Sequence, residues 1–594
     1  MHGSLVPLNN PSKLVIMNDV LALPTSNRSS ISSNGTRLSF VKILAVLMLV
    51  LLVSNVFFTA HTAHKVTNPP AHSHLRHFGH SNVPRIESLS PQSPSPPSSS
   101  QQYTPLLPAS VWATRVLPFG QASTNLTQLL NKDEIEKAIQ LCGSFYYSTL
   151  QRAVVASNLG SFVYVRTGDI DEMWVRDSVV QMSLYLATGR VTNHTVWSHL
   201  QQGSESDDAG GATTRKSIIP PPRRRPWLRP LVEGAIRRNA FNILQDPYAN
   251  AYSATWNNPS VYIMKKQIIG RGGWVGTRNY ELDSGAYFLH HLYDFYRSDQ
   301  DGLYRPESVL TEPLVFEAVL LMIDTWIVEQ RHDDWSPYRY FELENEGKGR
   351  PTNYTGMTWT GYRPSDDPCR YGYLIPANIH AAGALERVLL LNERIWRHEG
   401  LQAKATKLLR DIEKGIRQFG IVESDGVRIY AYEVDGFGGV LANFDDANVP
   451  SLLSIPLLGW TGYDEQVYRN TRDFLLSHRN QHYYKGNKLV GIGSPHTPAQ
   501  YVWPMALVIQ ALTEPDTNER DEQLAFQMRQ LLLSASNDAM HEGVYVHDVR
   551  RFTRPWFEWV RVMYLLCSEC GISRYVWIFD NADFLIVHRP MPYL

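Results

Sequence analysis

Four segments of the sequence combine carboxyl groups with aromatic and cationic side chains. Two carboxyl groups that face each other can break a glycosidic bond, because one protonates the departing oxygen while the other acts from the opposite side as base or nucleophile. Aromatic rings can stack on a sugar, and carboxylate and guanidinium groups can hold its hydroxyl groups. These segments are therefore the first candidates for a site that handles a hydroxyl-rich ligand.

The first segment, residues 167–177, reads TGDIDEMWVRD and lies at the start of a predicted helix. Asp169, Arg176 and Asp177 could hold the hydroxyl groups of a sugar. Trp174 could stack on the sugar ring. A structural explanation serves equally well, because Asp177 could cap the helix and Arg176 could pair with a neighbouring acid. Both interpretations stay open.

The second segment, residues 359–373, reads WTGYRPSDDPCRYGY. Its adjacent Asp366 and Asp367 follow Arg363 and are surrounded by aromatic residues. Neighbouring carboxyl groups near a cation can titrate at different pH values, so one of them can stay protonated near neutral pH and serve as an acid. The structural alternative is a turn in which Asp precedes Pro.

Two further segments carry a carboxyl group and an imidazole. In AMHEG, Glu542 follows a helical stretch and precedes the aromatic run 552–559, which suits a base that holds a water molecule. In GIGSPH, His496 ends a tight loop that could supply one or two hydroxyl contacts, and we favour this over a phosphate cradle. None of the four segments is specific by itself.

Composition and motifs argue against several other classes of protein. Lys and Arg total 56 against 57 Asp and Glu, so no overall field would attract nucleic acid. The sequence has neither the H-E-x-x-H helix nor the EF-hand spacing of metal sites. It also lacks the P-loop and the Rossmann fingerprint of nucleotide-binding proteins. We therefore expect no metal, no cofactor and no nucleic-acid partner.

The chain has too few cysteines for a disulfide scaffold, although one or two bridges remain open. The four are Cys142, Cys369, Cys567 and Cys570. The last two form a C-x-x-C pair without a second pair or a nearby His. This favours buried or incidental thiols over zinc or redox chemistry.

The elements that would position the four segments are mostly helices. Strand-like alternation is limited to short candidates at residues 162–166 and 428–432. Long loops rich in Gly, Pro and aromatic residues join the helices. This pattern predicts a mainly α fold, a toroid of helical hairpins whose loops at one end form a pocket. Apolar residues recur at helical spacing at residues 132–148, 177–188, 284–297, 312–329, 379–394, 401–419, 465–476, 501–513 and 519–534.

The first hundred residues have a different character. Residues 40–60 contain the apolar run ILAVLMLVLLVSNVFF, and cations outnumber acids on its N-terminal side. This predicts a signal anchor that crosses a membrane once, with residues 1–39 as a disordered cytosolic tail. A cleaved signal peptide is disfavoured, because only a short polar region precedes the apolar run of such a peptide, whereas residues 1–39 precede it here. Residues 61–109, rich in Pro and Ser, predict a disordered stem.

The predicted topology makes the rest of the chain the lumenal part of a type II membrane protein of the Golgi or endoplasmic reticulum. We assign the folded domain to residues 110–575, with a polar and then basic insertion at about 201–230, and a divergent tail to residues 576–594. Sequons at Asn125, Asn193 and Asn353 agree with this topology. Those at Asn27 and Asn34 would remain cytosolic and unmodified.

Taken together, the segments resemble glycoside hydrolase family 125, the exo-α-1,6-mannosidases. The similarity runs from about Thr167 to Trp559. A chance resemblance is improbable, because many motifs of the family occur here in the same order along the chain. The motifs are TGDIDEMWVRDS (167–178), DPYANAY (246–252), YELDS (280–284), GMTWTGYRPSDDPCRYGYLIPAN (356–378), DDANVPSLL (445–453), GIGSPHT (491–497), MHE (540–542) and TRPWFEW (553–559).

This resemblance implies an (α/α)6 barrel and a metal-independent, inverting release of single mannose units from the non-reducing ends of glycans. It places the general acid on Asp366 or Asp367, of which we favour Asp366, and the general base on Glu542. For inversion, the two carboxyl groups should stand roughly 6.5–9.5 Å apart. The expected substrate contacts are Asp169, Trp174, Arg176 and Asp177, with Asp283, Arg363 and His496 as further candidates.

Two features depart from the family pattern, namely the sequence after the base, Gly543-Val-Tyr, and the tail from Cys567 onward. One rival hypothesis is another helical-barrel exo-glycosidase, such as a glucoamylase-like enzyme. Another is a non-catalytic glycan-binding protein of the secretory pathway. The enzyme is favoured because a carboxyl group is present at both expected catalytic positions.

Overall fold

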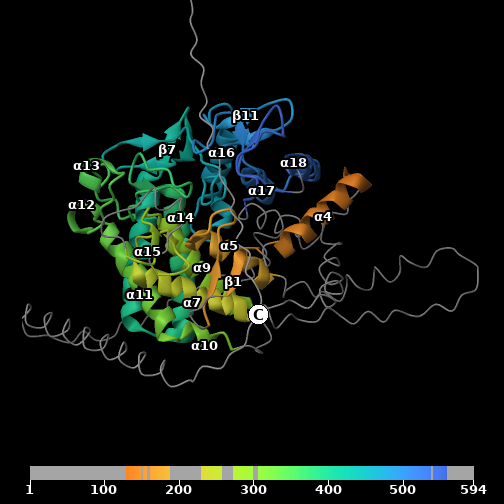
Figure 1. Cartoon of the computed structure of the whole chain (residues 1–594). Coiled ribbons are helices and arrows are strands. Elements are labelled where there is room, and N and C mark those ends of the chain that lie inside the picture. The colour runs from red at the N-terminus through yellow and green to blue at the C-terminus, as the bar shows by residue number, and fades with distance from the viewer. Residues whose placement is uncertain are drawn as a thin grey trace, which may run out of the picture. The chain divides into compact units, whose positions relative to one another are not determined.

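The structure is a computed structural model, and it describes seven parts of the chain (Figure 1). These are residues 129–148, 152–156, 161–187, 229–256, 272–298, 305–536 and 539–557. No helix in these parts is long and apolar enough to cross a membrane. The predicted tail, anchor and stem (1–39, 40–60 and 61–109) lie outside the described residues, as do most of the insertion, the tail 576–594, Asn125, Asn193, Cys567 and Cys570.

The main helices fall into an inner and an outer set. We call inner helices α5 (Val175–Ala187), α9 (Leu282–Ser298), α14 (Ile375–Leu391) and α17 (Pro504–Leu512). The outer helices are α7 (Arg229–Gln245), α11 (Pro313–Glu329), α15 (Glu399–Phe419), α16 (Glu465–Leu475) and α18 (Arg520–Ser534). α9 packs on both α5 and α14, while α11 packs on both α7 and α15. This alternation is the arrangement of a helical barrel.

The sequence accounts for the difference between the two sets. Outer helix α15 buries a single stripe that includes Leu401, Ala405, Leu408 and Ile412, spaced three or four residues apart. Inner helix α14 is buried on nearly all sides, because α9, α15 and the 3-10 helix η4 (Ile455–Leu457) all pack on it. Inner positions therefore need apolar or paired side chains all round.

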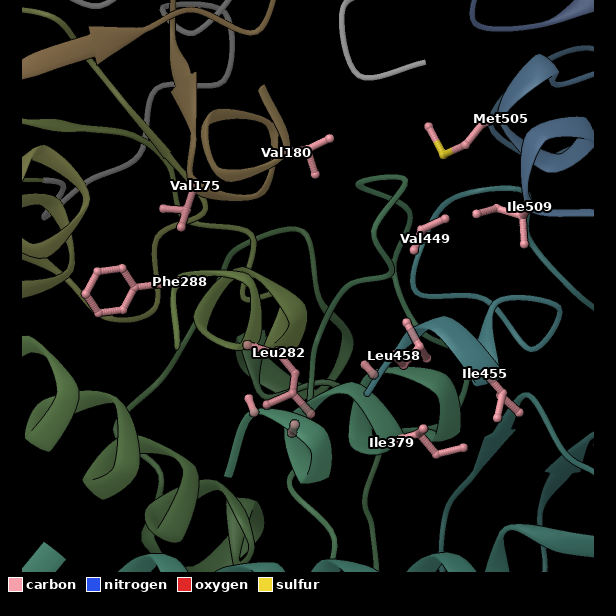
Figure 2. Close-up of a cluster of buried hydrophobic side chains, with 14 of the residues drawn as sticks. Val175, Val180, Leu282, Phe288, Ile379, Val449, Ile455, Leu458, Met505 and Ile509 are labelled. Atoms are coloured by element: carbon pink, nitrogen blue, oxygen red, sulfur yellow. The ribbon is translucent and has the colours of Figure 1, made fainter. Parts of the chain in front are cut away.

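The inner helices meet in one hydrophobic core. Figure 2 shows Val180 of α5, Leu282 of α9, Ile379 of α14 and Met505 of α17 in the same cluster, together with Leu458 beside η4. All five are buried. Burying a side chain of this size stabilises the fold by about 1.5–3 kcal/mol. The core therefore holds the inner helices, and the loops that lead into them, in fixed relative positions.

Small antiparallel sheets tie these loops together. β3 (Met173–Trp174), β6 (Tyr373–Leu374) and β13 (Tyr501–Val502) come immediately or one residue before α5, α14 and α17. Pairing of these strands therefore fixes three helix starts. The sheets in the described residues have the orders β3-β4-β5, β10-β9-β6, β13-β14, β1-β2, β7-β8 and β11-β12.

The remaining strands are β1 (Val154–Ala156), β2 (Val163–Val165), β4 (Ala251–Tyr252), β5 (Val275–Thr277), β7 (Ile421–Ser424), β8 (Val427–Tyr430), β9 (Glu433–Val434), β10 (Val440–Leu441), β11 (Tyr483–Lys485), β12 (Val490–Ile492) and β14 (Val544–Tyr545). The remaining helices are α4 (Lys132–Ser148), α10 (Glu307–Leu310), α12 (His332–Trp335), α13 (Glu344–Gly347) and the π-helix η3 (Asn392–Trp396).

The helical stretches expected from the sequence all correspond to helices, and both strand candidates to strands, with shifted ends. α14 begins at Ile375 rather than at residue 379, because Pro376 is tolerated in the first turn of a helix. The stretch at 501–513 starts with strand β13, and its helix begins only at Pro504. The sequence pattern did not predict α7 at all.

Candidate active site

The expected site segments lie in the loops that lead into the inner helices. TGDIDEMWVRD leads into α5, YELDS into α9, the loop with Asp366 and Asp367 into α14, and the loop with His496 into α17. Glu542 follows α18. Hydrogen bonds and ion pairs join these loops across long sequence separations, so the fold brings the segments together.

Arg176 stands among three buried carboxyl groups. Its Nη1 atom is 2.7 Å from Glu281 Oε2 and 3.4 Å from Asp283 Oδ2, and its Nε atom is 3.5 Å from Asp177 Oδ2. All four side chains are buried. Burial raises the pKa of both Asp177 and Asp283 to about 6, although Arg176 opposes the shift. A single guanidinium therefore stabilises several carboxyl groups of the site.

Asp366 lies at the edge of this group. Its backbone has a positive φ of 66°, which Asp adopts more readily than most residues. Asn250 Nδ2 donates a hydrogen bond to Asp366 Oδ1 at 2.8 Å, and Asn279 Nδ2 donates to the same oxygen at 3.2 Å. The loops before β4 and α9 thus hold the carboxyl group of Asp366 in one orientation.

Asp367 points to a different partner from its neighbour. Its Oδ1 atom lies 3.1 Å from Nδ1 of His496. This contact raises the pKa of His496 to about 9. Burial opposes the shift, while the charges of Asp367, Asp366 and Glu542 add to it. His496 is therefore expected to carry a positive charge near neutral pH.

Glu542 is buried beside a second cation, Arg554. Arg554 Nη1 lies 3.6 Å from Glu542 Oε1, and Arg554 also binds both carboxyl oxygens of Asp169 through its Nε atom, at 3.1 and 3.3 Å. The backbone of Glu542 donates to the carbonyl of Thr553 at 3.3 Å. Asp169 and Glu542, far apart in sequence, are thus joined through one arginine.

The electrostatic contacts link the two halves of the site. His496 experiences the charges of both Asp366 and Glu542. Asp177 experiences those of both Arg554 and Asp366. The structure therefore brings Asp366, Asp367 and Glu542 into one neighbourhood with Asp169, Arg176, Asp177, Asp283 and His496.

Two of the expected substrate contacts have other partners. Trp174 is only 3 % exposed and packs with Ala251 and Ile170, so it offers no open ring face for stacking. Arg363 is 8 % exposed, and its Nε atom lies 2.6 Å from Glu433 Oε1. Both side chains therefore support the surrounding loops in this structure.

The loop that carries Asp366 is anchored at several points. Glu433 Oε2 accepts hydrogen bonds from the backbone nitrogens of Arg370 and Tyr371, both at 2.8 Å. Ser365 Oγ donates to Asp446 Oδ2 at 2.8 Å. The free thiol of Cys369 is partly buried in the same loop. These contacts hold the acid pair rigidly against the helix starts.

Four residues of the network were not singled out from the sequence: Asn250, Asn279, Glu281 and Arg554. Asn250, Glu281 and Arg554 belong to the motifs DPYANAY, YELDS and TRPWFEW, so the resemblance marked their segments. The polar side chains within those motifs were the available signal. Asn279 lies just before YELDS and had no signal of its own.

The arrangement is suited to acid–base chemistry on a bound ligand. It supplies carboxyl groups on separate loops and three cations, Arg176, His496 and Arg554, that can stabilise their ionised forms. Among the described residues, His, Cys, Asp and Glu form no group of three or more that could hold a metal ion.

Comparison with known proteins agrees with this geometry. Residues 136–203 and 216–567 match the family described as metal-independent α-mannosidase (GH125). The chain belongs to this family. The resemblance seen in the sequence motifs is therefore confirmed, and the matched residues span the segments that carry those motifs. As a member of the family, the chain is a glycoside hydrolase.

Two related proteins extend the comparison. The meiotically up-regulated gene 157 protein of Schizosaccharomyces pombe is 32 % identical over 471 residues, which cover 75 % of this chain and 83 % of that protein. A metal-independent α-mannosidase of Streptococcus pneumoniae, solved in a non-productive complex with α-1,6-mannobiose, is 31 % identical. Its structure aligns with a TM-score of 0.62 over 76 % of this chain and 96 % of that chain. The helical-barrel fold is therefore shared.

Proposed function

We propose that the chain removes terminal α-1,6-linked mannose from glycans by single-step inversion. Asp366 protonates the departing glycosidic oxygen, and Glu542 takes a proton from the water that attacks the anomeric carbon from the opposite face. The observation that carries this proposal is that the loops of Asp366, Asp367 and Glu542 meet, with the charges of Asp366 and Glu542 both adding to the raised pKa of His496, within a chain that belongs to an α-mannosidase family.

Buried oxygens of the site support binding of a sugar. Both carboxyl oxygens of Asp177 and Oδ1 of Asp283 are buried and make no hydrogen bond with the described residues, although Asp177 Oδ2 lies 3.5 Å from Arg176 Nε. A buried polar atom without a partner costs free energy, which the hydroxyl groups of a bound mannose would offset. The complex of the related Streptococcus pneumoniae protein with α-1,6-mannobiose supports this linkage.

The proposal includes a location. A lumenal catalytic domain behind an anchor at residues 40–60 would meet glycans of the secretory pathway. Asn353, within a sequon, is exposed and therefore accessible to the glycosylation that this topology would allow.

The deciding experiment uses protein that begins at residue 110 and a panel of linkage-defined disaccharides. We expect release of mannose from α-1,6-mannobiose in the presence of a chelator, with β-mannose as the first product seen by NMR. Release of α-mannose first would disprove inversion. Preference for an α-glucoside would instead favour a glucoamylase-like enzyme.

A non-catalytic glycan-binding protein would be favoured if none of these compounds is hydrolysed and if Glu542→Gln leaves ligand binding and cellular function unchanged. A matched inactive control is Glu542→Gln in the same assay. Its loss of activity with retained thermal stability would show that the measured hydrolysis belongs to this chain.

A further inference from the structure

Arg554 connects the proposed general base to Asp169, a residue of the first site segment. The Nε atom of Arg554 lies 3.1 Å from Asp169 Oδ1 and 3.3 Å from Oδ2, and its Nη2 atom also donates to Oδ1. The remaining nitrogen, Nη1, faces the base, with 3.6 Å between it and Glu542 Oε1. We refer to Asp169, Arg554 and Glu542 as the Arg554 cluster. One planar guanidinium is thus held by the first carboxylate while it faces the second.

Contacts of neighbouring residues hold the three segments of the Arg554 cluster together. Gly168 pairs with Phe557 in an antiparallel bridge, and the backbone nitrogen of Phe557 donates to the carbonyl of Met540 at 3.4 Å. The backbone nitrogen of Thr553 donates to the carbonyl of Gly543 at 2.9 Å. The nitrogen of Gly543 in turn donates to Thr553 Oγ1 at 2.9 Å. A residue adjacent in sequence to each member of the cluster is therefore fixed.

The direction of the Arg554 side chain is fixed as well. Its backbone has a φ of 43°, a left-handed conformation that residues other than Gly rarely adopt and that costs free energy. Its guanidinium carbon lies 4.5 Å from the centroid of the Phe557 ring, which adds a cation–π contact. Backbone strain of this kind persists only where the surrounding structure holds the residue in place. The fold therefore maintains Arg554 in one position despite that cost.

The contacts of Asp169 favour a role in orientation. The sequence predicted that this residue would hold a hydroxyl group of the sugar, yet both of its carboxyl oxygens face Arg554. The side chains of Asp169 and Arg554 are 30 % and 23 % exposed. An ion pair that is partly open to water contributes little to stability. What such a pair does supply is a fixed direction, because the guanidinium fork matches the geometry of a carboxylate.

We propose that Asp169 is a positioning residue that acts on the reaction through Arg554, by fixing the guanidinium that orients the carboxylate of Glu542. This inference rests on the proposed function, because it takes Glu542 as the base. A base has to hold water in line with the anomeric carbon, and a misplacement of about 1 Å can lower the rate about 10²-fold. Without Asp169, only the contact with Glu542 would direct the polar end of the Arg554 side chain.

The test measures kcat and KM of Asp169→Asn, in protein that begins at residue 110, on α-1,6-mannobiose and on an aryl α-mannoside. Asparagine keeps the size of the side chain but removes the charge that pairs with the guanidinium. We expect kcat to fall by about 10- to 10²-fold, and equally on both substrates because water attacks in each case. KM should change by less than about twofold, since no substrate contact is removed.

The matched control is Asp171→Asn in the same loop. The side chain of Asp171 is 75 % exposed, and its Oδ1 atom lies 3.0 Å from Nη1 of Arg166 rather than from Arg554. This variant should leave kcat and KM unchanged on both substrates. A loss of kcat that equals the loss in Asp169→Asn would mean that any lost ion pair in this loop impairs the enzyme, and would overturn the inference.

Binding is measured separately, by calorimetry with α-1,6-mannobiose on the inactive variant Glu542→Gln. Addition of Asp169→Asn to this variant should change Kd by less than about twofold, because a positioning residue does not touch the sugar. Loss of a direct hydrogen bond between the carboxylate and a hydroxyl group would instead raise Kd about tenfold or more. The binding measurement therefore separates the two roles of Asp169 without reference to the rate.

A second variant, Arg554→Lys, keeps the test decisive if Asp169→Asn does not fold. Lysine retains the charge but lacks the planar fork that contacts two carboxylates, so kcat should fall while KM stays unchanged. The inference is overturned if either folded variant retains the wild-type kcat, if the loss is confined to the mannobiose, or if Asp169→Asn raises Kd in the Glu542→Gln background. Absence of mannoside hydrolysis by the wild type would instead overturn the proposed function.

Discussion

Two adjacent aspartates in the active-site loop face different partners, and this separates their expected roles. Asp366 contacts Asn250 and Asn279, whereas Asp367 contacts His496. We predict that Asp366→Asn lowers kcat on α-1,6-mannobiose by about 10²–10⁴-fold, the usual contribution of a general acid. The loss should be much smaller on an aryl α-mannoside whose leaving group needs no protonation.

Asp367→Asn serves as the matched control and should lower kcat by about tenfold or less on both substrates, because it removes only a charge near the site. Glu542→Gln should impair both substrates alike, since attack by water is needed in each case. A substrate-dependent loss confined to Asp367→Asn would transfer the role of acid to Asp367.

The His496–Asp367 pair gives a pH-dependent stability prediction. The pKa of His496 is raised from 6.5 to about 9, mainly by its hydrogen bond to Asp367. Because the folded value is the higher one, the stabilisation is fully present below about pH 6.5 and disappears as the pH rises through about 9. The His496 side chain is 39 % exposed, so the effect should stay below about 1 kcal/mol.

Melting temperatures of the wild type and His496→Gln, measured from about pH 6 to about pH 9.5, test this expectation. The wild type should have the higher melting temperature at the lower pH, and the two melting temperatures should be equal at the higher pH. A difference in melting temperature that stays constant over this range would show that the contact with Asp367 does not govern the titration of His496.

At the scale of single residues, the sequence predicted which segments meet but not the partners of each side chain. The motifs identified Asp366 and Glu542 as candidates before any geometry was known. Arg363 was expected to hold substrate, yet its partner is Glu433, which lies 70 residues further along the chain. Such a pairing depends on which strands meet, here β6 and β9, and no local pattern encodes it.

At the scale of elements, helix α14 makes a close approach to the loop that follows η4. A Cβ atom on Gly383 would lie 2.4 Å from the carbonyl oxygen of Leu458 and 2.7 Å from the backbone nitrogen of Trp460. Backbone atoms cannot move aside as a side chain can. We therefore predict that Gly383→Ala destabilises the fold by about 1–3 kcal/mol, measured as a lower melting temperature.

Gly400→Ala in α15 is the matched control. Its added Cβ would meet only the ring of His398, at 3.0 Å, and alanine has the higher helix propensity. The stability should change by less than about 1 kcal/mol. An equal loss in the two variants would mean that glycine replacement in general, and not the contact of α14 with Leu458 and Trp460, is responsible.

Helix α7 shows where periodicity fails to predict an element. Its buried positions include Arg238, Asn239 and Asn242, so the apolar repeat is interrupted. Arg238 Nε donates to Asn242 Oδ1 at 3.0 Å, and its Nη2 donates to the carbonyl of Ser253 at 2.6 Å. Arg238 thus has one partner within the helix and one in a distant loop, while its Nη1 atom and Asn239 Oδ1 make no hydrogen bond with the described residues. A single sequence does not reveal such partners.

At the scale of the whole molecule, the meeting of distant loops was the property that was least predictable from the sequence. Asp169 and Arg554 form an ion pair although 385 residues separate them. Periodicity predicted a mainly helical toroid, and the family resemblance implied the barrel. Neither could state which side chains meet across it, because that depends on the packing of all the inner helices at once.

The predicted topology of the whole chain can be tested with its sequons. Asn353 is exposed, and within the described part of the chain its Nδ2 atom donates a single hydrogen bond, to the carbonyl of Gly436 at 3.3 Å, so a glycan can be carried there. If residues 40–60 anchor the chain with residues 1–39 in the cytosol, Asn353→Gln should remove one glycan, seen as a faster-migrating band that matches partial endoglycosidase digestion. The control is Asn34→Gln, which removes a sequon on the cytosolic side and should leave migration unchanged.

A change in migration with Asn34→Gln but none with Asn353→Gln would show the opposite orientation. Unglycosylated protein that is extracted without detergent would exclude the anchor itself.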